Sequence, residues 1–436
     1  MLNLLVLPSL RKWVISLAQS FSKPQKVHLL TILFGVLLRQ APLTLERVRR
    51  IAGQRSSLSA LTRFLDSNQW EPADLWLPVR RAMLAEAIGR AGRRPQRVRW
   101  RKKKGRKVKR IVRRLVPVYL SIDDTLLEKP PASQHLEGFA WHWDHNQKKS
   151  VWALCVVTVN VQIGGHVFPG AFEVYLPRKT VRQLRKRHPQ LRFVKKTDLA
   201  QDLLRTFEGL FPRDRFSVTA LMDSFYSSNK ILNYCRRQHW TAIAAIKKNR
   251  ILDEKRVDHH AQTVASKAWE RVSVPNVSDT KTQTYRVVLL TGRLQGVRGR
   301  GSVVISKRGR RDHSPKYFFS TDPTLSVQEI LARYAKRWHV ELDYFFLKEK
   351  LGLGDFRIRN WGAIRRYLTI VCVALCWLQY YRWQLGDGHN TMPTLAETIA
   401  HCRRVLTQRR LRAVYRLTQQ NYSQEKILTK LFADAA

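Results

Sequence analysis

The chain has 436 residues, with 80 Lys and Arg against 32 Asp and Glu, which leaves a formal net charge of +48. Its 44% hydrophobic and 26% charged residues are typical of a globular protein, and its length favours two or three domains over one compact core. The composition excludes a mostly disordered chain. The charge indicates a polyanionic partner, above all nucleic acid, because so basic a surface repels itself unless phosphates neutralise it.

Other broad features point to the cytoplasm and not to a membrane. The most apolar run, Leu368 to Leu378, is shorter than the ~20 residues that a membrane-spanning helix needs. At the N-terminus apolar residues precede Arg11 and Lys12, which reverses the order of a secretory signal. The cysteines show no paired metal-ligand spacing, which is typical of a reducing compartment. They are Cys155, Cys235, Cys372, Cys376 and Cys402.

Residues 1–92 carry apolar groups at helical spacing and predict a helical domain. Within it, LTLERVRRIAGQRSSLSALTRFL predicts two short helices around a Gly turn, as in a DNA-binding helix-turn-helix, although ordinary helical packing explains the pattern equally well. Residues 93–115 are dominated by Arg and Lys and predict a basic linker. Such a run stays extended and solvated until a polyanion neutralises it, so we expect it to be poorly ordered without DNA.

From residue 116 the pattern changes to strands alternating with helices, which predicts an α/β architecture with a mixed sheet. We divide this part into a first core segment (116–250), a β-rich insertion (251–320), a second core segment (321–390) and a C-terminal helical segment (391–436). Long helices are expected over 327–351 and 363–385.

Acidic residues stand at three places where phosphodiester chemistry would use them. Asp123 and Asp124 end the first predicted strand, Asp223 ends a later one, and Glu341 lies inside the helix expected over 327–351. An acid at the end of a strand also caps turns, so each one alone has an ordinary structural explanation.

The helix around Glu341 carries a mixture of groups suited to a metal-bound phosphodiester. At ~100° per residue, Tyr334, Arg337, Glu341 and Lys348 fall within an arc of about 60°. Ser326 and Glu329 predict a capping box at the start of this helix, and Gly352 a stop. An exposed face with salt bridges at helical spacing is the simpler alternative.

The stretch YAKRWHVELDYFFLK resembles the Tyr-Arg-Glu-Lys signature of bacterial cut-and-paste insertion-sequence DDE transposases. SIDDT resembles the first-aspartate block of that family, and TALMDSFYSS the second. The resemblance implies a ribonuclease H-like catalytic core interrupted by a β insertion, in agreement with the strand pattern.

The resemblance also implies roles for individual residues. Asp124, Asp223 and Glu341 would bind the metal and catalyse, while Tyr334, Arg337 and Lys348 would contact the DNA end. Asp124 is chosen over Asp123 because the aspartate of the family directly precedes Thr, and because neighbours on a strand face opposite sides. Asp123 remains the alternative.

The expected function is that of a DNA transposase, which cleaves transposon ends and transfers strands into target DNA with Mg²⁺, for which Mn²⁺ substitutes. Its partners would be double-stranded DNA and a second copy in a homodimer, in the bacterial cytoplasm near the nucleoid. A ribonuclease H-like nuclease without strand transfer and a nonenzymatic basic DNA-binding protein are the alternatives. His142 and His145 lack a matching Cys or His pair for zinc, so DNA contact is the preferred role of their segment.

Overall fold

The chain is described by a computed structural model in which most residues are placed. The described ranges are 7–39, 42–52, 56–66, 69–92, 97–103, 106–112, 115–133, 135–275, 282–309, 314–387 and 391–431. Side chains of residues 97–103 and 106–112, of residue 410 and of residues 428–431 lie outside this description.

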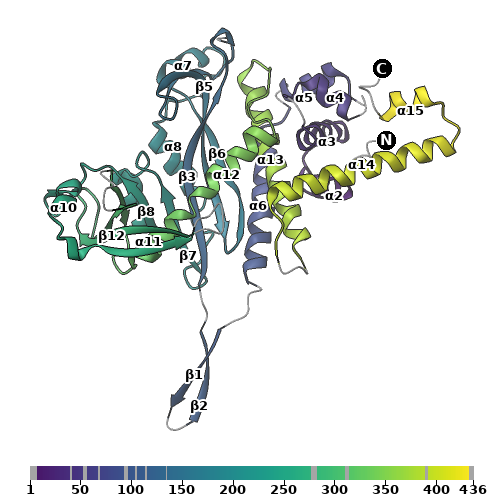
Figure 1. The fold of residues 1–436 in the computed structure, drawn as a ribbon. Coiled ribbons are helices and arrows are strands. Elements are labelled where there is room, and N and C mark those ends of the chain that lie inside the picture. The colour runs from purple at the N-terminus through teal and green to yellow at the C-terminus, as the bar shows by residue number, and fades with distance from the viewer. Residues whose placement is uncertain are drawn as a thin grey trace.

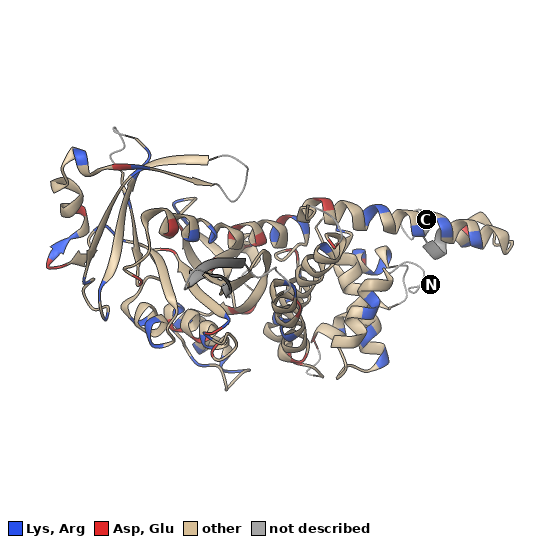
Figure 2. Ribbon diagram, turned by 90° about the horizontal axis from the view of Figure 1, so that it is seen from below, with Lys and Arg blue, Asp and Glu red and all other residues tan. Residues whose placement is uncertain are grey.

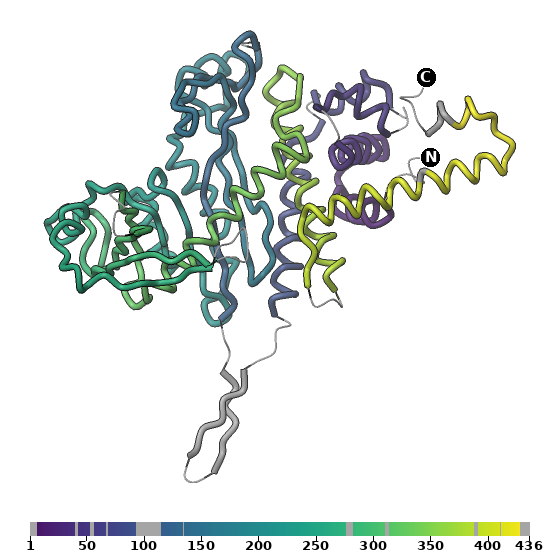
Figure 3. The backbone as a smooth tube through the Cα atoms, viewed as in Figure 1, coloured from purple at the N-terminus to yellow at the C-terminus, as the bar shows by residue number. Residues whose placement is uncertain are grey.

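A group of helices forms one end of the molecule, drawn in purple in Figures 1 and 3. Ser22 begins the second of them with a capping box closed by Gln25. The two helices expected of a helix-turn-helix are present, but residues 53–55 of the turn between them lie outside the described residues. The helices of this end are α2 (Pro8–Leu17), α3 (Lys23–Leu37), α4 (Leu45–Ile51) and α5 (Leu58–Asp66). The longer α6 (Pro72–Gly92) follows them and lies between this end and the central strands (Figure 1).

The basic segment after α6 differs from the linker that the sequence predicts. Its backbone forms two strands, β1 (Arg97–Lys103) and β2 (Arg106–Val112), which pair antiparallel along their whole length. An extended backbone is expected for such a run of charges. Pairing the two halves lets their backbone N–H and C=O groups bind each other, whereas in an isolated extended segment these groups bind water.

The centre of the molecule is a mixed sheet with the strand order β6–β5–β3–β7–β8. The first three strands are antiparallel neighbours, while β3, β7 and β8 run parallel. This confirms the predicted α/β class and is the arrangement expected of a ribonuclease H-like core. The strands are β3 (Val116–Glu128), β4 (Ala140–Asp144), β5 (Lys149–Ile163), β6 (His166–Tyr175), β7 (Phe216–Met222) and β8 (Thr241–Ile246), and β4 also pairs with β5.

Residues 251–320 contain several strands. Four of them extend the central sheet, and the two short strands at the start of the region pair with each other in a separate two-stranded sheet. The last of the four pairs antiparallel with β8, and the others follow outward in the order β13, β12, β11. Figure 3 shows this region in green, beside the central strands. Its elements are β9 (Ile251–Leu252), β10 (Lys255–Arg256), α10 (Val257–Thr263), β11 (Glu270–Pro275), β12 (Thr282–Gly292), β13 (Gly301–Lys307) and β14 (Lys316–Ser320).

Two predicted boundaries are wrong in ways that bear on the site. Strand β3 does not end at Asp123 and Asp124 but continues to Glu128, because β5 pairs with it through that residue. The helix expected over 327–351 is broken into α11 (Val327–Ala335), α12 (Trp338–Phe345) and a π-helical turn, η3 (Phe346–Lys350).

The remaining helices cover the sheet and join it to the helical end. Helix α13 (Trp361–Leu385) packs against α3, α5, α6, α14 and β6. It is long and apolar enough to span a membrane, yet 89% of its most apolar window is buried inside the fold, so it is a core helix. The others are α7 (Arg178–Leu184), α8 (Lys196–Arg205), α9 (Asn229–Arg237), α14 (Leu395–Gln419) and α15 (Gln424–Leu431).

Candidate active site

The turn after β7 holds Asp223. Its Oδ1 accepts the backbone N–H groups of Phe225 at 3.0 Å and Tyr226 at 3.1 Å. Asp side chains commonly organise turns in this way, and here the turn leads into α9, which Ser228 caps. Among the described residues no hydrogen bond reaches Oδ2 of Asp223, so this oxygen remains open to a ligand.

Asp123 and Asp124 face opposite sides of β3, as neighbours on a strand must. Asp123 Oδ2 accepts Nη1 of Arg337 at 2.6 Å. Asp124 instead accepts the hydroxyl of Tyr226 at 2.6 Å and Nζ of Lys196 at 3.0 Å. The carboxylate that the sequence analysis preferred, Asp124, and its alternative, Asp123, therefore belong to different clusters.

Arg337 joins Asp123 to Glu341. While Nη1 donates to Asp123, Nη2 donates to Glu341 Oε1, one turn further along the chain. The Arg337 side chain is 15% exposed, and its guanidinium carbon lies 5.8 Å from the centre of the Tyr334 ring. The break between α11 and α12 falls at Lys336 and Arg337, where backbone hydrogen bonds span three residues instead of four.

Among the acids around Arg337, Asp123 has a raised pKa. Burial, together with the nearby charges of Asp223 and Asp124, raises its pKa to about 7, although Arg337 opposes the shift. Burial alone would lower the pKa of Arg337, but Tyr334, Asp123 and Glu341 together raise it above its usual value. Several carboxylates thus lie close together, and Arg337 is their counterion. A cation added at such a place binds favourably, because it reduces the repulsion between the carboxylates.

Lys348 lies apart from this group. Burial lowers its pKa, and the acids that oppose the shift are Asp144, Glu349 and Glu128. The sequence predicted one helical face carrying Tyr334, Arg337, Glu341 and Lys348. The structure brings the first three together, while the π-helical turn carries Lys348 toward the β4–β5 turn.

The donor set suits a hard divalent cation, although the side chains do not yet surround one. Among the described residues no three His, Cys, Asp or Glu side chains approach closely enough to hold one ion. The acids near Arg337 offer carboxylate oxygens alone, which are the ligands that Mg²⁺ prefers. Arg337 stands between two of them, and its Nε is buried without a hydrogen-bond partner among the described residues. The residues fit a metal that would replace Arg337 as the counterion.

Two residues of the site were missed by sequence reasoning. Tyr226 lies inside the quoted second-aspartate block, and its position three residues after Asp223 is a signal that could have found it. Lys196 lies on α8, far from any block, and no pattern around it indicates a role. His142 is near this second cluster too. Burial and the charge of Lys196 lower its pKa to about 4, and Asp124 opposes the shift.

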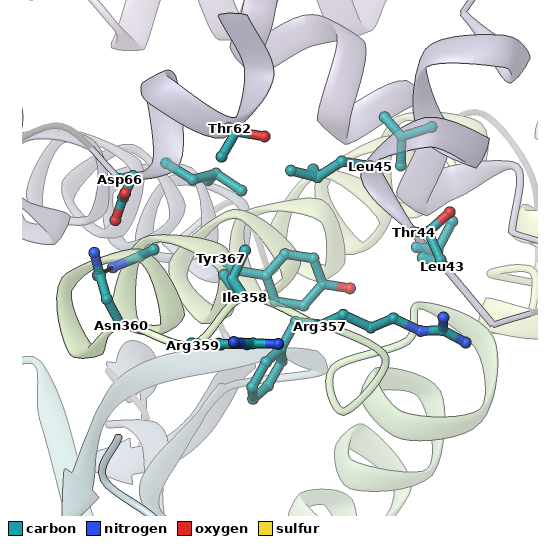
Figure 4. A pocket seen from close by; sticks show the side chains of 14 residues that line it. Leu43, Thr44, Leu45, Thr62, Asp66, Arg357, Ile358, Arg359, Asn360 and Tyr367 are labelled. Atoms are coloured by element: carbon teal, nitrogen blue, oxygen red, sulfur yellow. Dashed lines mark hydrogen bonds between the residues drawn. The ribbon is translucent and has the colours of Figure 1, made fainter. Parts of the chain in front are cut away.

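A cavity of about 410 Å³ lies away from these acids, between α4 and α5 on one side and the segment 356–360 with α13 on the other (Figure 4). Its walls are mainly apolar, with Arg357 and Arg359 among the labelled side chains. Neither Asp123, Asp223 nor Glu341 lines it. It marks the junction between the helical end and the segment that follows η3.

Comparison with known proteins bears on the same acids. Residues 95–284 match the family described as DDE superfamily endonuclease and include Asp123 and Asp223. Residues 194–377 match the family described as Transposase DDE domain and include Asp223 and Glu341. The central part of this chain therefore matches domains of DDE transposases and endonucleases. The protein is therefore an enzyme of DNA transposition that cleaves DNA, and domains of this kind depend on a divalent metal ion.

No curated protein matches the chain. Among solved structures, it is similar to the cryo-EM structure of piggyBac transposase synaptic complex with hairpin DNA. The identity is 10% and the TM-score 0.48, over 99% of this chain and 83% of that chain.

Proposed function

We propose that this transposase is of the bacterial insertion-sequence type, and that Asp123, Asp223 and Glu341 are its metal-binding carboxylates. The observation that carries the proposal is the bridge from Arg337 to both Asp123 and Glu341, beside Asp223. It brings together acids from two strands of the core and one helix. All three lie within the segments that match DDE domains.

Asp123 takes the place that the sequence assigned to Asp124. Both oxygens of Asp124 already accept hydrogen bonds, from Tyr226 and Lys196, on the other face of β3. Because hydrogen bonds already stabilise the Asp124 carboxylate, a metal ion would stabilise it less than it would stabilise Asp123. Burial and acidic neighbours raise the pKa of Asp123.

When bound, a pair of Mg²⁺ ions, or Mn²⁺ in their place, would stabilise the attacking and leaving oxygens of the phosphodiester. The protein supplies the carboxylates and orients the DNA. If metal ions bound Asp123 and Glu341, the planar guanidinium of Arg337 would be free to bind oxygens of the phosphate. Tyr334 supports Arg337 from the ring face, and Lys348 binds the backbone of the same DNA end.

The partners follow from the same chemistry. Double-stranded DNA neutralises the formal charge of +48, whose Lys and Arg residues recur over the helical end as well as the sheet (Figure 2). Joining two element ends to one target needs two active sites, so we propose a homodimer on DNA. Its place would be the bacterial cytoplasm, at the nucleoid.

The test is cleavage of DNA that carries the inverted repeats flanking the gene. Asp123→Asn, Asp223→Asn and Glu341→Gln should each lower cleavage at least about 10³-fold, because the metal ions supply several kcal/mol of charge stabilisation and each ~1.4 kcal/mol is tenfold in rate. Affinity for the DNA should be kept. Asp202→Asn, an exposed acid of α8 that pairs with Arg205, is the matched control and should cut normally.

Each other outcome has a definite meaning. Cutting at the parent rate by all three variants would refute the metal-binding assignment. Cleavage without strand-transfer products would replace the transposase by a ribonuclease H-like nuclease. DNA binding without metal-dependent cleavage by the parent would leave a nonenzymatic DNA-binding protein.

A further inference from the structure

We propose that Asp124 is a positioning residue, which fixes the turn carrying Asp223 through two side chains, Tyr226 and Lys196. The inference rests on the proposed function, since it assigns Asp223 to the metal. It gives Asp124 a part in the reaction that differs from the role expected from the sequence. Its basis is a set of contacts that joins β3 to the turn after β7.

The first connection runs through Tyr226. The backbone N–H of this residue donates to Oδ1 of Asp223, and its side-chain hydroxyl donates to Oδ1 of Asp124 at 2.6 Å. Tyr226 is fully buried, so its ring has no freedom to move away from Asp124. Tyr226 therefore binds Asp124 with its side chain and Asp223 with its backbone.

The second connection runs through Lys196 and Phe225. Lys196 Nζ donates to Oδ2 of Asp124 at 3.0 Å and lies 5.1 Å from the centre of the Phe225 ring. Phe225 supplies the other backbone N–H that binds Asp223, at 3.0 Å. Phe225 is 48% exposed, and the ammonium group of Lys196 near its ring attracts the ring through a cation–π interaction.

Both N–H groups that orient Asp223 thus belong to residues whose side chains contact the Asp124–Lys196 pair. Asp124 is itself held in place, since the thiol of Cys155 donates to its Oδ2 at 3.4 Å in addition to the two stronger bonds. Removing a residue that orients a metal ligand commonly lowers metal affinity or activity by 10- to 100-fold. An effect of about that size is expected here.

The experiment compares two Tyr→Phe variants of the full chain. Tyr226→Phe removes the hydroxyl that binds Asp124 but keeps the ring in the core. Tyr234→Phe is the matched control, because the hydroxyl of Tyr234 also donates to a carboxylate, that of Glu208, at 2.7 Å. Tyr234 lies on α9, outside the site. Binding of Mn²⁺ is measured by calorimetry without DNA, and thermal unfolding is recorded for each variant.

The dissociation constant for Mn²⁺ should rise about 10- to 100-fold in Tyr226→Phe and stay at the parent value in Tyr234→Phe. The metal concentration that half-saturates cleavage should rise in parallel, and saturating metal should restore most of the rate. A role in folding alone would lower the unfolding temperature of both variants without separating their metal affinities. Parent-like Mn²⁺ binding by Tyr226→Phe would overturn the proposal.

Asp124→Asn separates positioning from direct ligation. The amide keeps an oxygen for Tyr226 but loses the charge that pairs with Lys196, so a weakened metal affinity with cleavage recovered at high metal is expected. No cleavage at any metal concentration would make Asp124 a ligand and refute the positioning role. Failure of the proposed function looks different, since Asp223→Asn would then still cleave DNA.

Discussion

Replacing Arg337 by Met tests whether this guanidinium occupies the position of a metal ion. Met has a similar length and no charge, so the change leaves Asp123 and Glu341 without their shared counterion. The pair formed by Arg337 and Asp123 is short, at 2.6 Å, with side chains 15% and 19% exposed. We expect the variant to be destabilised without metal and to be restored by it.

The size of the effect follows from the burial of the pair. Removing one partner of a buried ion pair costs about 3–5 kcal/mol, and the residual exposure here favours the lower end, about 3 kcal/mol. A divalent ion that binds only the folded state, at a concentration 100 times its dissociation constant, raises the free energy of unfolding by about 2.7 kcal/mol. The parent should gain less from the same metal concentration, because there the ion has to displace Arg337.

The assay is chemical denaturation with and without Mn²⁺, and Arg39→Met is the control. Arg39 pairs with Asp355 at 2.6 Å, with side chains 15% and 12% exposed, so the two losses without metal should be similar. Manganese should restore Arg337→Met and leave Arg39→Met unchanged. Equal responses of the two variants to Mn²⁺ would show that the metal does not bind at Asp123 and Glu341, the carboxylates with which Arg337 pairs, and would refute this reasoning.

Two further predictions concern His142 and Lys348. Burial lowers the pKa of His142 from 6.5 to about 4, so its neutral form favours the folded state, and the stability it contributes is present above pH 6.5 and lost as the pH falls toward 4. Relative to His142→Gln, the parent should lose about 1.4 kcal/mol of unfolding free energy between about pH 7.5 and pH 5.5, and a difference independent of pH would contradict the burial argument. Lys348→Ala should weaken binding of element-end DNA and reduce the slope of log affinity against log salt by about 1, as measured by fluorescence anisotropy, whereas an unchanged slope would remove Lys348 from the DNA contacts.

The sequence predicts the core of the fold well where the signal is local. The apolar strands that became β5, β7 and β8 are recognisable from their residue pattern, and the capping box of Ser326 and Glu329 is present as expected. Gly352, the predicted stop after η3, adopts a positive φ of 73°, a conformation that glycine tolerates without strain.

Features decided by distant contacts were missed. No Gly or Pro marks the break at Lys336 and Arg337, where Arg337 is drawn to Asp123, more than two hundred residues earlier in the chain. Asp123 and Asp124 are identical in residue type and adjacent, so their roles depend on which helix covers each face of β3. The basic charge of residues 97–112 indicates solvation but carries no information about strand pairing.

Because β14 pairs with β8, the insertion is joined by backbone hydrogen bonds to the sheet that carries the acids. Strand β7, which Asp223 follows, is the one strand between β8 and β3 in the sheet. The ring centres of Phe318 on β14 and Tyr334 are 4.6 Å apart. A force that DNA exerts on the insertion would be transmitted through these strands to the acids. A variant without residues 251–320 would leave the edge of β8 unpaired. That edge would then have to be covered, because an exposed strand edge can pair with another chain.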